Sequence, residues 1–250
     1  MKAYLENCVL EVKNLRVSVE NKEIVKGISL SLHKGEVVYL FGRNGEGKST
    51  LLRAIAGYPG YRIIEGKVFF EGEDITNIPM HERAKKGLIL GFQHPPEFDT
   101  IRVEDLFREI GIDLSNSRIV RYIRTLKLRN LLKRPLNNGF SGGEKKRMET
   151  FLVLAMNPKI ALFDEPDSGV DIDSLKLVAS ALKLYREENP EASYLIVTHQ
   201  GYLLDLLPGN RAMVILEGKL LCTKNPYEVY QTIMKYGYER CLECLKKEIQ

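Results

Sequence analysis

The stretch GRNGEGKS occupies residues 42–49 and fits the pattern G-x-x-x-x-G-K-[ST] of a phosphate-binding loop in full. Its glycines let backbone N–H groups converge on phosphate oxygens without clashes from Cβ atoms. The apolar run EVVYLF at 36–41 predicts a buried strand before the loop, and the apolar spacing of Ser49–Gly57 predicts a helix after it. The N-terminus of that helix adds partial positive charge. The stretch therefore predicts a nucleotide site between a strand and a helix.

The residues of this loop have separate expected roles. Lys48 is expected to reach the β- and γ-phosphates of ATP, and the Ser49 hydroxyl is expected to bind Mg²⁺. Glu46 is unusual, because it places a carboxylate in a loop that holds a polyanion; it either points to solvent or is offset by Arg43. The residues predicted to contact the nucleotide from this part of the chain are Gly42, Arg43, Asn44, Gly45, Glu46, Gly47, Lys48, Ser49 and Thr50.

A second apolar run, Ile160–Phe163, ends in two acids, Asp164 and Glu165. On its own the run fits an ordinary buried strand with a polar exit equally well. The phosphate loop upstream favours a functional interpretation, because a strand beside that loop would bring both carboxylates to the phosphates. We expect Asp164 to bind Mg²⁺, directly or through water, and Glu165 to act as the general base that polarises the attacking water.

The N-terminal third of the chain has the pattern of short strands separated by turns. Strands are predicted at Leu10–Leu15, Val17–Val19 and Ile28–Leu32, with a turn at Asn21-Lys22, and a hairpin is predicted at Gly66–Ile75. Further along the chain, strand patterns alternate with helical ones. This alternation predicts an α/β fold with a largely parallel sheet.

The middle of the chain, from Pro95 to Pro135, changes to a helical pattern that is rich in arginine and leucine. Strand patterns return after it, with a hairpin predicted at Met213–Cys222 and a helical tail from Pro226. We therefore expect a single domain over residues 1–250. Its catalytic α/β core would comprise 1–94 and 151–250, and a helical subdomain would be inserted at 95–150.

Composition narrows the class of protein. The 250 residues are 44% apolar and 28% charged, which is typical of a folded globular protein. The net charge of +4 is not gathered into one run, and the basic stripe Arg118, Arg121 and Arg124 has one aromatic neighbour, Tyr122, so we expect no nucleic-acid partner. No apolar run approaches the roughly 18 residues of a membrane span, and no signal peptide is evident. We therefore expect a cytoplasmic protein without direct membrane insertion.

The four cysteines do not form the pattern of a disulfide framework. Cys241 and Cys244 form a C-x-x-C pair on a predicted helix, but a zinc or cluster site needs about four ligands. A partly buried helix face is the favoured interpretation of this pair, and a metal or redox role is the alternative.

The segment FSGGEKKR at 140–147 resembles the LSGGQ signature of ABC ATPases, and other family motifs match in the family's order. Gln93 lies where the family has its Q-loop glutamine, residues 167–171 resemble the D-loop, and His199 resembles the switch histidine. The resemblance covers nearly the whole chain. It implies a P-loop NTPase fold of ABC type, with a mostly parallel core sheet, an antiparallel β subdomain and an inserted helical subdomain.

The resemblance also implies an ATPase that works as a dimer. Its implied catalytic residues are Glu165, His199, Gln93 and Lys48, and its implied Mg²⁺ ligands are Ser49, Gln93 and Asp164. The signature residues Ser141, Gly142 and Gly143 would contact ATP held by a second copy of the chain, which makes dimerisation dependent on ATP. Residues 17–22 lack the aromatic side chain with which many relatives stack on adenine.

Three stretches, FSGGEKKRME, DEPDSGVDIDSL and GFQHPPEF, resemble ATPase subunits of the Suf iron–sulfur cluster assembly system. This resemblance implies soluble scaffold partners, SufB-like and SufD-like, which would bind near Gln93. It also implies a resting state in which Lys146 holds Glu165 away from water. The alternative is the nucleotide-binding subunit of an ABC membrane transporter, which would use the same site residues.

Overall fold

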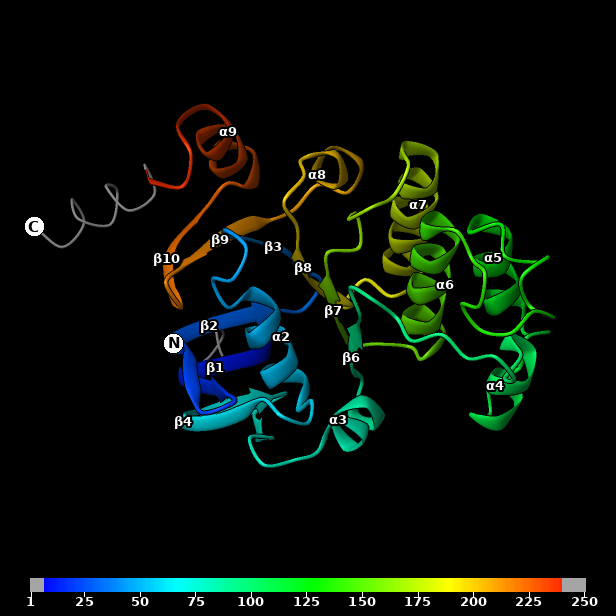
Figure 1. Cartoon of the computed structure of the whole chain (residues 1–250), viewed down its shortest axis with the longest axis horizontal. Helices are drawn as coiled ribbons and strands as arrows, with labels where there is room; N and C mark the ends of the chain where they lie inside the picture. Colours follow the sequence, from blue (N-terminus) through cyan, green and yellow to red (C-terminus); the bar gives the residue numbers. More distant parts are fainter. Residues whose placement is uncertain (1–6, 240–250) are drawn as a thin grey trace, which may run out of the picture.

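The computed structural model describes residues 7–239, whose strands form two sheets (Figure 1). The strands of the larger sheet are β3 (Val37–Phe41), β6 (Leu88–Gly91), β7 (Ile160–Asp164), β8 (Ser193–Val197), β9 (Arg211–Leu216) and β10 (Lys219–Lys224). They lie in the order β10-β9-β3-β8-β7-β6, and each neighbouring pair is parallel except β9 and β10. The prediction of a mostly parallel core sheet is therefore confirmed.

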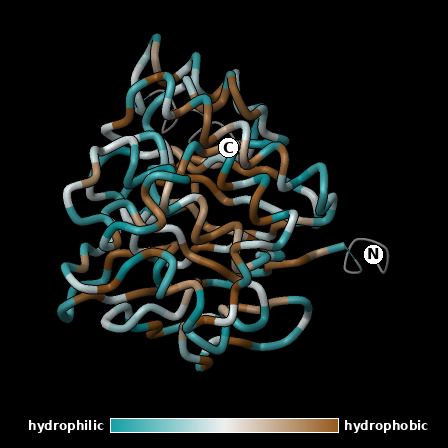
Figure 2. The backbone as a smooth tube through the Cα atoms, turned by 90° about the vertical axis from the view of Figure 1, so that its right-hand side faces the viewer, coloured by the Kyte–Doolittle hydropathy of each residue, from teal (hydrophilic) through white to brown (hydrophobic). Residues whose placement is uncertain are grey.

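Both faces of this sheet are buried. Along β3, Val37, Tyr39 and Phe41 belong to one apolar cluster, whereas Val38 and Leu40 belong to another. Successive side chains of a strand point to opposite faces, so an uninterrupted apolar run is the pattern of a strand covered on both sides. Burial of each such side chain contributes roughly 1.5–3 kcal/mol. In Figure 2 the apolar segments accordingly gather in the interior.

The smaller sheet is antiparallel, with β2 (Lys22–His33), β1 (Cys8–Val19), β4 (Arg62–Phe70) and β5 (Glu73–Asp74) in that order. The prediction of two separate strands within residues 10–19 is wrong, because the structure has one continuous strand there, β1. The interruption in the sequence pattern reflects a bulge, with a φ of 45° at Asn14 and a register shift between Val12 and Leu15. The turn to β2 lies at residues 20–21, one position before the predicted turn.

The helices cover both faces of the core sheet: α2 (Lys48–Ala56), α3 (Met80–Lys86), α4 (Val103–Glu109), α5 (Ser117–Thr125), α6 (Gly142–Ala155), α7 (Ile172–Glu188), α8 (Tyr202–Leu206) and α9 (Pro226–Tyr236). Leu51, Leu52 and Ile55 of α2 share an apolar cluster with the inner face of the smaller sheet, so α2 is sandwiched between the two sheets. On the opposite face, α6 and α7 lie side by side against the core sheet, with α4 and α5 farther out (Figure 1).

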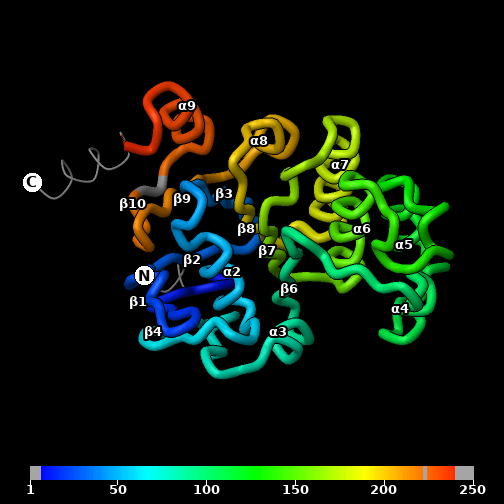
Figure 3. Tube along the Cα trace, viewed as in Figure 1, coloured from blue at the N-terminus to red at the C-terminus, as the bar shows by residue number. Residues whose placement is uncertain are grey.

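Residues 95–150 contain α4, α5 and the first part of α6, as the green part of the trace in Figure 3 shows. The predicted boundary at residue 150 falls inside α6, which continues to Ala155 and packs on α7. The division of the chain into a core and a helical subdomain stays a prediction.

The C-terminal predictions have separate outcomes. The hairpin predicted at 213–222 is formed by β9 and β10, and α9 begins at Pro226, where Asn225 caps its N-terminus. Cys241 and Cys244 lie outside the described residues. Within residues 7–239, none of the helices has the length and apolar character needed to cross a membrane.

Candidate active site

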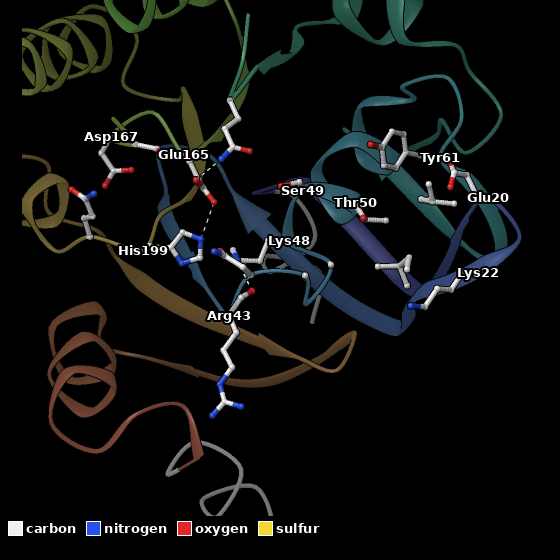
Figure 4. A pocket seen from close by; sticks show the side chains of 18 residues that line it. Glu20, Lys22, Arg43, Lys48, Ser49, Thr50, Tyr61, Glu165, Asp167 and His199 are labelled. Carbon is white, nitrogen blue, oxygen red and sulfur yellow. Dashed lines mark hydrogen bonds and ion pairs between the residues drawn. The ribbon is translucent and has the colours of Figure 1, made fainter. Parts of the chain in front are cut away.

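A pocket of about 1190 Å³ opens where β3, β7 and β8 end (Figure 4). The carboxyl ends of parallel strands are the usual place for ligands in open α/β sheets. Most of the predicted loop residues line the pocket, as do Gln93, Glu165 and His199. Gly42, Glu46 and Asp164 do not line it directly, and neither do Ser141, Gly142 and Gly143. The structure therefore brings most of the predicted site residues to this pocket, whereas the signature segment lies outside it.

The phosphate loop follows β3 and leads into α2. Gly47 caps α2 with a φ of 100° and without a side-chain hydrogen bond, so the first backbone N–H groups of the helix have no capping side chain. A Cβ at Gly42 would lie 2.4 Å from the carbonyl oxygen of Ile215, which explains the need for glycine. Lys48 Nζ donates to the carbonyl oxygens of Gly42 and Arg43, both at 2.8 Å, and burial lowers its pKa. The loop therefore presents N–H groups and the Lys48 ammonium group, with Arg43 also in the pocket lining.

Glu46 turns to the neighbouring hairpin. Its carboxylate accepts a hydrogen bond from the backbone N–H of Glu217, in the turn between β9 and β10. The Arg43 guanidinium lies 3.4 Å from the carboxylate of Glu239 and forms an exposed ion pair with it. The structure adds a contact that the sequence did not suggest, in which the Glu46 carboxylate ties the phosphate loop to an exposed strand turn.

Asp164 ends β7 beneath α2 and is 2% exposed. Ser49 Oγ donates to Asp164 Oδ1 at 2.9 Å, while Asp164 Oδ2 is buried without a hydrogen bond and lies 3.9 Å from Arg53. Burial raises the pKa of Asp164. No group of three His, Cys, Asp or Glu side chains that could hold a metal occurs among the described residues. A hydroxyl beside a carboxylate that has one oxygen free of hydrogen bonds does fit Mg²⁺, which takes most of its ligands from phosphate and water.

The carboxylate of Glu165 is held from two sides. Gln93 Nε2 donates to Glu165 Oε2 at 2.6 Å, and His199 Nε2 lies 2.8 Å from Glu165 Oε1. These residues follow β6, β7 and β8, which are neighbours in the sheet, so the topology brings them together. Figure 4 shows Glu165 and His199 turned toward one another. Glu165 has a φ of 53°, a left-handed conformation that costs a non-glycine residue roughly 1–3 kcal/mol.

Lys146 of α6 is buried beside this cluster. Its ammonium group donates to the carbonyl oxygens of Gln93 and Glu165, both at 2.7 Å, and burial lowers its pKa. Lys146 thus contacts Glu165, as expected, but through the backbone carbonyl oxygen, whereas Gln93 and His199 contact the carboxylate. The expectation that Lys146 keeps Glu165 away from water in a resting state stays a prediction.

The signature segment begins α6. Ser141 and Glu144 form a capping box, in which Ser141 Oγ accepts from the Glu144 N–H at 3.2 Å and the Glu144 carboxylate accepts from the Ser141 N–H at 2.8 Å. A Cβ at Gly143 would lie 2.3 Å from Ser174 Oγ of α7, so close helix packing requires the glycine. Ser141 and Gly142 are exposed and face no nucleotide pocket of their own chain.

Several residues of the site escaped sequence reasoning. Val19, Glu20, Lys22 and Ile24 of the β1–β2 hairpin line the outer pocket, and Tyr61 is the only Phe, Tyr or Trp among the described lining residues. The resemblance pointed only to the stretch 17–22, which holds Val19, Glu20 and Lys22. For Ile24 and Tyr61 the sequence offered no signal, because their approach to the loop is set by sheet packing. Asp167 also lines the pocket and accepts a hydrogen bond from the Thr198 hydroxyl, and burial raises its pKa to about 6.

Comparison with known proteins points to one family. The sequence model of the ABC transporter family matches residues 25–168. The iron–sulfur cluster assembly protein SufC of Plasmodium falciparum is 36% identical, over 94% of this chain and 72% of that protein. A probable ABC transporter ATP-binding protein of Streptococcus pyogenes is 37% identical, over 85% of this chain and 87% of that protein.

Solved structures agree with the fold. The ADP conformation of an ATP-binding cassette of an ABC transporter has a TM-score of 0.72 and 25% identity, and covers 92% of this chain and 95% of that one. A dimeric ATP-binding cassette in a post-hydrolysis state, bound to ADP and phosphate, has a TM-score of 0.72. It is 23% identical and covers 86% of this chain and 98% of that one, so it supports the fold alone.

Proposed function

The chain belongs to the ABC transporter family and is an ATPase, and on this premise we propose that it drives a Suf-type iron–sulfur cluster assembly complex in the cytoplasm. The observation that carries the proposal is the 36% identity with a SufC protein along 94% of the chain. The motifs FSGGEKKRME and DEPDSGVDIDSL support the same assignment. The second candidate, a transporter subunit, is favoured by the similarity to a probable ABC transporter ATP-binding protein.

In this proposal the pocket binds ATP with its phosphates on the loop at 42–49. When ATP binds, Lys48 exchanges its two backbone acceptors for phosphate oxygens. The negative charge of the phosphates then offsets the cost of burying the Lys48 ammonium group. Glu165 accepts a proton from the attacking water, whose oxygen forms a bond to the γ-phosphorus while the bond to the bridging oxygen breaks. Gln93 and His199 orient the carboxylate for this transfer. Ser49 and Asp164 would hold Mg²⁺, with Gln93 as a further ligand, and the ion would neutralise phosphate charge.

The site is completed by a second copy of the chain. The signature residues do not line the pocket of their own chain, yet Ser141 and Gly142 are exposed at the start of helix α6, and helix starts are places where anions bind. Ser141, Gly142 and Gly143 would contact the γ-phosphate held by the other copy. Because that contact requires the γ-phosphate, dimerisation would depend on ATP and reverse on hydrolysis.

The partner surface is proposed to lie in the segment that follows Gln93. There Phe98 and Ile101 are 38% and 39% exposed, so this segment presents two apolar side chains at the surface. A soluble scaffold seated on them would be moved when the ATP dimer closes. The protein itself is proposed to carry neither iron nor sulfide.

The test is to purify the tagged protein from its own cells without detergent and to identify its partners by mass spectrometry. Soluble scaffold proteins of iron–sulfur cluster assembly are expected, and Phe98→Ser should reduce their recovery. Met234→Ser is the matched control, because Met234 is 66% exposed on α9. Recovery of a membrane protein with several spans only after detergent extraction would overturn the Suf assignment in favour of the transporter.

A further inference from the structure

Glu149 is a buried acid that the proposed hydrolysis does not use. It lies on α6 and is 8% exposed. Its Oε1 atom accepts a hydrogen bond of 2.7 Å from the backbone N–H of Phe92, immediately after β6. Lys146, one turn earlier on the same face of α6, donates to the carbonyl oxygen of the next residue, Gln93. Two side chains of one helix therefore hold backbone groups of two consecutive residues, Phe92 and Gln93.

We propose that Glu149 is a positioning residue for ATP hydrolysis: by fixing the Phe92 backbone to α6, it places the Gln93 amide against Glu165. The proposal rests on the roles proposed above for Gln93 and Glu165. The contacts form a continuous chain, from Glu149 to the Phe92 N–H, and from Gln93 Nε2 to Glu165 Oε2 at 2.6 Å. Lys146 closes the loop through the Glu165 carbonyl oxygen.

The chemistry of the site explains why an acid is found there. The strand hydrogen bonds of β6 end at Gly91, so the N–H group of the next residue, Phe92, needs another acceptor. A buried N–H group without an acceptor costs roughly 1–3 kcal/mol of stability. Glu149 supplies that acceptor from a helix instead of from a neighbouring strand. The acceptor therefore moves with α6, whose first residues are the signature segment.

This arrangement gives the signature segment a mechanical connection to the site of its own chain. A shift of α6, when Ser141 and Gly143 engage a nucleotide, would move Phe92 and Gln93 through Glu149. It would also move the backbone of Glu165 through Lys146. The two nucleotide sites of a dimer would then be coupled through rigid helices and hydrogen bonds.

The first test compares two substitutions at one position. Glu149→Met keeps the approximate volume but removes the acceptor, and should lower kcat for ATP about tenfold with KM within about twofold, because the contact acts on the reacting geometry. Glu149→Gln keeps an acceptor and should stay within about twofold of the wild type. Thr150→Val is the control, since the Thr150 hydroxyl bonds only within α6, to the Lys146 carbonyl oxygen. Equal defects in Glu149→Met and Glu149→Gln would overturn the proposal.

A double-mutant cycle with Gln93→Ala then decides whether Glu149 acts through Gln93. If it does, Glu149→Met should change kcat less than about twofold in the Gln93→Ala background. Independent, multiplicative defects would overturn the inference about Glu149 alone. Normal hydrolysis by Gln93→Ala would overturn the proposed role of Gln93 as well, so the two failures are distinguishable. Thermal unfolding of every variant checks that the measured protein is folded.

Discussion

His199 Nε2 lies 2.8 Å from Glu165 Oε1, across the ends of the adjacent strands β7 and β8. The other carboxylate oxygen accepts a hydrogen bond from Gln93. A carboxylate has about four lone-pair positions, so both oxygens can still accept a hydrogen bond from water. The geometry therefore fixes the orientation of Glu165 without using up its capacity as a base.

Glu165→Gln should separate hydrolysis from binding. The amide cannot take a proton from water, so we expect ATP turnover to fall at least about a hundredfold, as is usual for the loss of a general base. Lys48 and the loop are untouched, so ATP affinity should persist and size-exclusion chromatography should show more ATP-bound dimer. Lys48→Ala is the contrasting variant and should lose ATP binding. Near-normal turnover by Glu165→Gln would remove Glu165 from its proposed role.

Glu46→Ser should leave ATP affinity within about twofold of the wild type, or increase it. The Glu46 carboxylate bonds to the Glu217 N–H of a surface turn, where water can replace it at little cost. Its removal also takes a negative charge away from the phosphate loop. Isothermal titration with ATP measures the effect, and Glu46→Gln separates charge from hydrogen bonding. A large loss of affinity in Glu46→Ser would mean that the tether itself shapes the loop.

The fold and the location of the pocket could be predicted because their signals are local. The loop at 42–49 is contiguous in sequence, and the buried strands Val37–Phe41 and Ile160–Asp164 contain uninterrupted apolar runs, the second of which ends at Phe163. Strand β1 was harder, because the bulge at Asn14 breaks its alternation. The roles of the site residues remain predictions, although the structure brings Gln93 and His199 to Glu165.

The family resemblance implied a contact between Lys146 and Glu165, but the contacts of α6 with Phe92 and Gln93 could not be predicted from the sequence. A charged residue in a helix ordinarily lies on the face exposed to solvent. Lys146 and Glu149 belong to the charged run EKKRME, so their residue types indicate exposed side chains. Their burial depends on peptide groups near Gln93 and Glu165, which are distant in sequence. Only the tertiary arrangement shows that these groups need a donor and an acceptor.

Arg83→Met should strongly destabilise the fold. The guanidinium of Arg83 is 2% exposed and donates to four backbone carbonyl oxygens, two of them at the C-terminal end of α2. Leaving such acceptors unpaired costs on the order of 3 kcal/mol, which lowers Tm by about 6–12 °C in a chain of this size. Arg108→Met is the control, because Arg108 forms an exposed ion pair with Asp105 and should change Tm little. Equal, small shifts would contradict the structural role of Arg83.

The stability of Glu149→Gln relative to the wild type should increase as pH rises. Burial raises the pKa of Glu149 to about 7 from an ordinary value of 4.5, with hydrogen bonding to Phe92 and the charge of Lys146 opposing the rise. The folded state therefore favours the protonated acid, whose contribution is complete below pH 4.5 and is lost as pH rises through 7. Glutamine does not titrate, so the variant lacks this dependence on pH. A shift of one pKa unit corresponds to about 1.4 kcal/mol of stability. The Tm of the variant relative to the wild type should therefore increase by at least about 2–4 °C between pH 5 and pH 8. Asp167 titrates in both proteins and cancels in the difference. A Tm difference independent of pH would show that Glu149 is charged throughout this range.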